Sequence, residues 1–110
     1  MTIEWADFER VELRVGTVRS AEHNPRARNP ALVLTVDLGE RGVRTSSAQI
    51  TDHYDPADLI GRQVLCVCNF EAKRVAGVRS EVLVTGVADE HGAVVLPTFD
   101  HPVPDGSRLA

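Results

Sequence analysis

The chain is poor in cysteine and has no long apolar stretch, and each shortage excludes a class of protein. No apolar run approaches the roughly 18 residues that a membrane-spanning helix needs. The N-terminus carries Glu4, Asp7 and Glu9 where a secretory signal would be basic and then apolar, so we expect no membrane insertion and a cytoplasmic protein. The two cysteines, Cys66 and Cys68, stand one residue apart inside an apolar run, which does not suit a disulfide framework. A reducing compartment fits this usage.

Aromatic side chains are also scarce, with three Phe, one Trp and one Tyr. Proteins that hold many bases of a single strand lay them on a track of aromatic rings, so an extended track of that kind is excluded and the footprint should be small. The Cys66 and Cys68 pair has no second Cys or His pair at ligand spacing, which argues against a zinc site. The eight glycines are dispersed among turns and form no phosphate-binding loop. We therefore expect no catalytic residues, no metal and no cofactor.

Hydrophobic residues make up 43% of the 110 residues and charged residues 25%, the balance of a single globular domain spanning residues 1–110. The net charge of -4 weighs against indiscriminate adhesion to nucleic acid, but it is unevenly distributed. Residues 13–44 carry +3 and residues 73–81 carry +2, between acidic segments. The basic residues of these two blocks are Arg14, Arg19, Arg26, Arg28, Arg41 and Arg44 in the first, and Lys73, Arg74 and Arg79 in the second. An ordinary solvated surface of mixed charge is the alternative interpretation.

Apolar and polar residues alternate with a period of two along much of the chain, which predicts β-strands. The expected strands cover residues 13–19, 31–38, 43–48, 63–69 and 81–87, with a last short strand at 93–96. Gly16 marks a bend or bulge in the first of them. The fourth is apolar on both faces, so we expect it to be covered on its outer side as well as its inner side.

The connections between these strands carry turn and helix signals. A basic, proline-containing loop occupies residues 24–30, a hairpin turn residues 39–42, and a second long loop residues 70–79. Asp55 and Pro56 begin a short helix over residues 56–60, which Gly61 ends. Five main strands with one short helix between the third and fourth predict an all-β fold, a five-stranded OB-type barrel.

Four strings of residues resemble the tRNA-binding-domain family. They are Leu13-Arg14-Val15-Gly16, Ser46-Ser47-Ala48-Gln49-Ile50, Asn69-Phe70 and the run from Gly77 to Val84. The family includes the C-terminal tRNA-binding extension of bacterial methionyl-tRNA synthetases. Chain length and the closing Pro102-Val103-Pro104-Asp105-Gly106 are more similar to its free-standing CsaA-like members, described as export-related chaperones. Where those members tend to carry prolines after Asn-Phe, this chain has Glu71-Ala72.

The resemblance implies an OB-fold that pairs as a homodimer through its N- and C-terminal extensions, without catalysis. Trp5 and Phe8 near one end, with Phe99 and Val103 near the other, would supply the apolar dimer interface. The alternative is that these residues fold back on their own barrel. Two copies would also duplicate the basic loops, which raises apparent affinity for a ligand that reaches both.

The main candidate site is the loop from Asn69 to Glu81, which we expect to bind tRNA or similarly structured RNA. Lys73, Arg74 and Arg79 would contact phosphates, and Phe70 would stack on a base unless it belongs to the core. Asn69 and Ser80 either hydrogen-bond the RNA or only tie the backbone of the loop. The Ser46, Ser47 and Gln49 string, beside Arg44, either faces the ligand or caps a strand. The complete candidate set is Arg44, Ser46, Ser47, Gln49, Asn69, Phe70, Lys73, Arg74, Arg79, Ser80 and Glu81.

The same segment supports a second hypothesis of a different class. Phe70, Val75 and Val78 could line an apolar groove with a polar rim, which suits an unfolded or export-bound polypeptide. The residues alone do not choose between RNA and polypeptide as the ligand.

Overall fold

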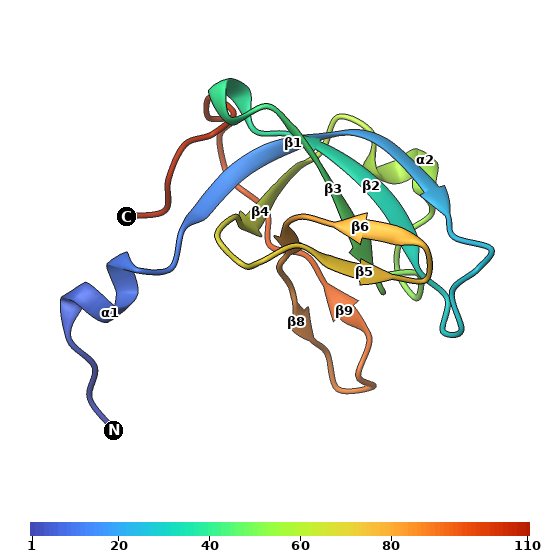
Figure 1. Cartoon of the computed structure of the whole chain (residues 1–110), viewed down its shortest axis with the longest axis horizontal. Helices are drawn as coiled ribbons and strands as arrows, with labels where there is room; N and C mark the ends of the chain where they lie inside the picture. The colour runs from blue at the N-terminus through green and yellow to red at the C-terminus, as the bar shows by residue number, and fades with distance from the viewer.

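The computed structural model describes residues 1–110 and is mostly β-structure with two short helices (Figure 1). The elements in chain order are α1 (Trp5–Glu9), β1 (Leu13–His23), β2 (Leu32–Asp37), a 3-10 turn η1 (Gly39–Arg41), β3 (Val43–Ala48), α2 (Pro56–Leu59), β4 (Gln63–Val67), β5 (Lys73–Val75), β6 (Val78–Ser80), β7 (Leu83–Val84), β8 (Val87–Ala88) and β9 (Val94–Val95). Five strands form one antiparallel sheet in the order β3-β2-β1-β4-β7. The N–H of Glu81 donates to the carbonyl of Thr45 at 2.8 Å, which brings the two edges together. The expected five-stranded barrel is confirmed.

The core lies inside the barrel and follows the period of two. On β2 the side chains of Leu32, Leu34 and Val36 are fully buried, while the residues between them are half-buried. Leu59 of α2 is also fully buried and belongs to this core. On β4 the side chains of Cys66 and Val67 are both buried, although successive residues of a strand point to opposite faces. This strand is therefore covered on both sides at that point, as its doubly apolar sequence predicts.

β1 is longer than expected, because its second half continues to His23 and pairs with β2. The register shift of this pair falls between Val18 and Ser20, so the bulge predicted at Gly16 lies further along the strand. Gly16 is required instead because there is no room for a side chain at this position. A Cβ built on it would lie 2.4 Å from Cγ1 of Val36 and 2.9 Å from the backbone oxygen of Asp37. The missing side chain lets β2 pack closely against β1.

The segment 70–79 was expected to be a loop, but it contains the hairpin of β5 and β6. Its turn consists of Ala76 and Gly77, with φ angles of 47° and 84°. Ala76 is the one non-glycine residue of the chain with a positive φ. The predicted strand at 81–87 is interrupted at Thr85 and Gly86, so that it forms β7 in the barrel sheet and β8 in a separate hairpin with β9.

The two terminal extensions lie near each other at one end of the barrel (Figure 1). The C-terminal segment pairs with β1. The N–H of Val15 donates to the carbonyl of Ser107 at 2.9 Å, and the N–H of Leu109 donates to the carbonyl of Leu13 at 2.8 Å. The helix α1 stands away from the barrel (Figure 1). Neither helix has the length and apolar character required to cross a membrane.

Candidate nucleic-acid interface

The cations of the two basic blocks separate into two groups according to their partners. Nε of Arg14 and Nη1 of Arg41 both contact Oε1 of Glu12, at 2.7 and 2.6 Å. Arg19 pairs with Asp37 at 3.0 Å. The hydrogen bond from Arg14 holds the pKa of the Glu12 carboxyl below its usual range. These three arginines are engaged with carboxylates and hold the strands and terminal segments together.

The second group has no carboxylate within ion-pair distance. It consists of Arg26, Arg28, Arg44, Lys73 and Arg74. All five are exposed. Arg79 falls between the groups, because its exposed guanidinium lies 3.3 Å from Oε2 of Glu81. An exposed cation without an internal partner is available to phosphate groups.

Tertiary structure brings the loop 24–30 of the first block against the tip of the β5–β6 hairpin. The side-chain amide of Asn24 donates to the carbonyl of Ala76 at 3.3 Å. The guanidinium of Arg26 packs on Gly77, where an added Cβ would lie 2.4 Å from Nη1. Arg26 and Arg28 line a recess of about 400 Å³ with Val75 and Ala76. The two basic blocks, far apart in sequence, therefore meet at this hairpin.

A second cavity of about 420 Å³ lies beside the hairpin and shares Val75 with this recess, and we call it the Phe70 pocket. Its lining consists of Ser47, Phe70, Glu71, Lys73, Val75, Ser80, Glu81, Val82 and Leu83. The ring of Phe70 is 61% exposed and Leu83 is 47% exposed, so both present apolar surface to a ligand. Phe70 is thus a surface residue and not part of the core. An exposed ring beside free cations suits the stacking of a base.

Several predicted site residues are occupied within the chain. Oδ1 of Asn69 accepts from the N–H of Glu12 at 2.9 Å, and its amide donates to the carbonyl of Arg10 at 2.7 Å. Asn69 therefore ties the end of β4 to the N-terminal extension, and its amide groups have structural partners. Ser80 is similar, because its hydroxyl accepts from the N–H of Ser47 at 3.0 Å.

Of the other predicted site residues, Ser46 lies inside the barrel, whereas Glu81 lines the Phe70 pocket and also bonds within the chain. Ser46 is fully buried, opposite Leu34 on β2, so its hydroxyl points into the barrel and does not reach a surface ligand. Oε1 of Glu81 accepts from the N–H of Thr45 at 3.1 Å, which helps to close the barrel. Ser47, whose side chain lies on the opposite face to Ser46, and Gln49 line cavities beside the hairpin.

Arg26, Arg28 and Leu83 were missed as site residues. The basic character of loop 24–30 is visible in the sequence, but its position against the hairpin is not. Leu83 alternates with buried Val82 and Val84, which could have marked it as outward-facing.

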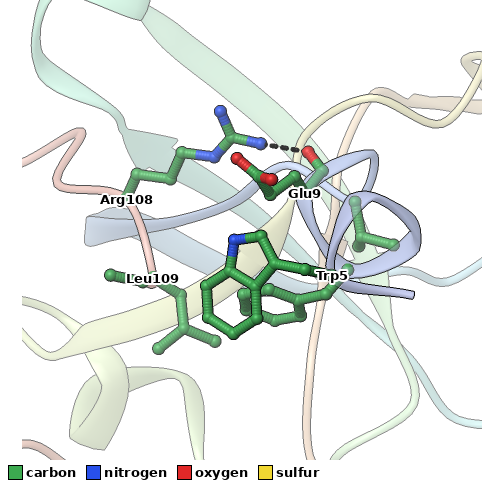
Figure 2. Close-up of a pocket in the computed structure, with 7 residues that line it drawn as sticks. Trp5, Glu9, Arg108 and Leu109 are labelled. Carbon is green, nitrogen blue, oxygen red and sulfur yellow. Dashed lines mark hydrogen bonds between the residues drawn. The ribbon is translucent and has the colours of Figure 1, made fainter. Parts of the chain in front are cut away.

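The terminal apolar residues do not form one cluster. The rings of Trp5 and Phe8 lie 5.7 Å apart, and with Leu109 they line a groove between α1 and the C-terminus (Figure 2). Arg108 donates to the backbone oxygen of Glu9 across it. Val103 lies elsewhere, since its N–H and carbonyl both bond to the side chain of Gln63. Phe99 is half-buried and does not line the groove.

Metal-ligating side chains are not gathered anywhere in the chain, as no three of His, Cys, Asp or Glu lie close enough to hold an ion. Burial raises the pKa of the Cys66 thiol to about 12, so this sulfur stays protonated and packs as a small apolar group.

Known proteins resemble this chain over nearly all of its length. A chaperone CsaA of Bacillus anthracis is 47% identical, with complete coverage of both chains and a TM-score of 0.93. A CsaA chaperone protein of Picrophilus torridus is 35% identical, covers 99% of this chain and 100% of its own, and has a TM-score of 0.91. The methionine-tRNA ligase of Methanocaldococcus jannaschii is 36% identical over 107 residues, 97% of this chain.

This chain spans 16% of the length of that ligase, so it corresponds to one part of a much larger enzyme. The family model described as a putative tRNA binding domain matches residues 13–108, which include the barrel, the hairpin and the C-terminal segment paired with β1. The chain therefore belongs to the family of putative tRNA-binding domains.

Proposed function

We propose that this protein is a non-catalytic homodimer that binds tRNA or similarly structured RNA in the cytoplasm. The observation that carries the proposal is the convergence of cations without a carboxylate partner on the β5–β6 hairpin, next to the exposed ring of Phe70. Phosphates require cations that are not already neutralised, and bases require a flat apolar surface. Membership of the family supports tRNA as the RNA. Two free cysteines are compatible with a reducing compartment.

Binding to tRNA should weaken linearly with the logarithm of salt concentration. Each phosphate contact contributes a slope of about -0.7 for single strands to -0.9 for duplexes, because contact releases condensed counterions. Replacing Lys73 by alanine should remove about one phosphate contact and make the slope less negative by the share of that contact. Filter binding or fluorescence anisotropy with unfractionated tRNA, at several salt concentrations, measures this slope. Affinity that is independent of salt would contradict the proposal.

A polypeptide is the second candidate ligand, because two similar proteins of known structure are described as chaperones and the Phe70 pocket has apolar walls. This candidate predicts suppression of the aggregation of an unfolded client, with little dependence on moderate salt. Suppression of aggregation by a protein that fails to bind tRNA would favour it over the RNA proposal.

The homodimer is proposed from the groove between α1 and the C-terminus. Trp5 is 70% exposed there, and Val11 and Leu109 add further exposed apolar surface. A surface of this kind is buried favourably when a second copy covers it, and buried tryptophans are often the residues that dominate an interface.

Replacing Trp5 by alanine should weaken the dimer by about 30-fold, the equivalent of about 2 kcal/mol. Sedimentation equilibrium measures it, since the chain alone has a mass of 12.0 kDa. Val43→Ala is the matched control, because Val43 is 54% exposed on β3 and does not line this groove. A single 12.0 kDa species for the unchanged protein at all concentrations would rule out the dimer.

A further inference from the structure

The Phe70 pocket contains carboxylates, whereas its surroundings are cationic. Two carboxylates, Glu71 and Glu81, line the pocket together with one ammonium group, Lys73. Outside it, Arg74 lies on the same hairpin and Arg26 packs against the hairpin turn, and neither has a carboxylate partner. We call the surface formed by Arg26 and Arg74 the cationic ridge. A phosphate is attracted to this ridge but is less favoured inside the pocket.

Glu71 is the carboxylate in this pocket that remains free. The carboxylate of Glu81 accepts from Thr45 and pairs with Arg79, so its oxygens are occupied. The side chain of Glu71 is exposed and makes no hydrogen bond or ion pair with the chain. Its two oxygens are acceptors only. They are available to a ligand that presents hydrogen-bond donors beside the ring of Phe70.

Charge and shape together select the kind of ligand. A basic peptide would satisfy Glu71 but would be repelled by the cationic ridge. An acidic peptide would be attracted by the ridge but repelled by Glu71. A nucleic-acid strand fits both regions, because its backbone is anionic while its bases are neutral and carry N–H donors. The cavity of about 420 Å³ is far larger than the roughly 10–15 Å³ that one water needs. It is large enough to receive an extruded base.

We propose that the Phe70 pocket is a subsite for one unpaired base and that Glu71 makes it selective for guanine. Guanine is the base whose Watson–Crick edge places two donors, N1–H and N2–H, side by side, which matches the two oxygens of a carboxylate. Uracil presents a single N–H between two carbonyl oxygens, which the carboxylate repels. This inference rests on the proposed RNA-binding function and adds a base preference to it. Glu71 is then a specificity-determining residue.

The test uses RNA hairpins with one stem and a loop of uridines, in which a single loop position is guanosine, inosine or uridine. Fluorescence anisotropy at one fixed salt concentration gives the affinities for the full chain. We expect guanosine to bind about tenfold more tightly than uridine, as a bidentate base contact allows, with inosine between them because it lacks the N2 amino group. In Glu71→Gln the three affinities should agree within about twofold, because an amide replaces one acceptor with a donor.

Glu90→Gln is the matched control, since it makes the same change of charge at an exposed carboxylate in the turn between β8 and β9, where it does not line the pocket. We expect Glu90→Gln to bind the three RNA hairpins in the same order of affinity as the unchanged protein. Equal affinities for the unchanged protein, or a guanosine preference that survives Glu71→Gln, would overturn the inference while leaving salt-dependent RNA binding intact. Failure of every hairpin and of tRNA to bind would instead reject the proposed function, and the base preference with it.

Discussion

Replacing both Arg26 and Arg74 by alanine is expected to weaken tRNA binding by about 30-fold, since each exposed ion pair with a phosphate contributes up to about 1 kcal/mol. Both guanidinium groups are exposed at the β5–β6 hairpin and neither is paired with a carboxylate. The slope of log affinity against log salt should also become less negative by the share of about two phosphate contacts. Anisotropy titrations with tRNA at several salt concentrations measure the affinity and the slope together.

The matched control replaces Arg19 and Arg41, which lowers the net charge by the same two charges. These arginines are paired with Asp37 and Glu12, and their side chains are 54% and 47% exposed. We expect tRNA affinity to change by less than about threefold in this variant, because surface ion pairs contribute little and no phosphate contact is removed. Equal losses in the two double variants would mean that total charge governs binding and that the position of the cations does not. Thermal melting followed by circular dichroism confirms that both variants are folded.

Gly16→Ala is expected to lower the free energy of unfolding by about 3 kcal/mol or more, the upper range for an overfilled core. The new Cβ would lie 2.4 Å from Cγ1 of Val36 and 2.9 Å from the backbone oxygen of Asp37. A side chain can change rotamer, but the backbone contact is relieved only if β2 moves away from β1, which would disturb the pairing of Thr17 with Asp37 beside it. Urea unfolding followed by circular dichroism measures the loss.

Gly92→Ala is the control for this substitution. Gly92 has a φ of 81° and no atom within 4 Å of an added Cβ, so alanine there meets backbone strain but no collision. We expect a loss of about 1 kcal/mol, the usual cost of a left-handed conformation for a residue with a side chain. If Gly16→Ala were no more destabilising than Gly92→Ala, the close approach of β2 to β1 would not be a requirement of the fold.

Prediction from sequence succeeded where a strand has one buried face and enough residues to repeat. β2 was expected at nearly its observed bounds, because buried residues alternate with half-buried ones through all six of its residues. β3 was expected at its observed bounds, since the turn at residues 39–42 marks its start and its second half alternates. The β5–β6 hairpin was missed for the opposite reason. Its strands have three residues each, and its turn begins with Ala76, a residue that does not signal a positive φ.

The candidate site was predictable by residue type but not by position. Phe70, Lys73 and Arg74 are neighbours in sequence, so their chemistry could be read together. Ser46 and Ser47 could not be distinguished, because only the register of β3 on β2 decides which hydroxyl enters the core. Asn69 is polar and exposed, as a ligand-binding residue would be, yet its amide is bonded to the N-terminal extension.

By itself, the sequence determined the barrel and the chemical character of its hairpin, since alternation along a strand and the residue types of a short segment are local properties. Tertiary structure alone decided which cations are available. Arg14, Arg19 and Arg26 are chemically the same residue, and what separates them is whether folding brings a carboxylate or only backbone to the guanidinium. Glu12 is a local partner of Arg14, but the groups that meet Arg19 and Arg26 come from distant segments, so the availability of those charges depends on long-range contacts that no local pattern encodes.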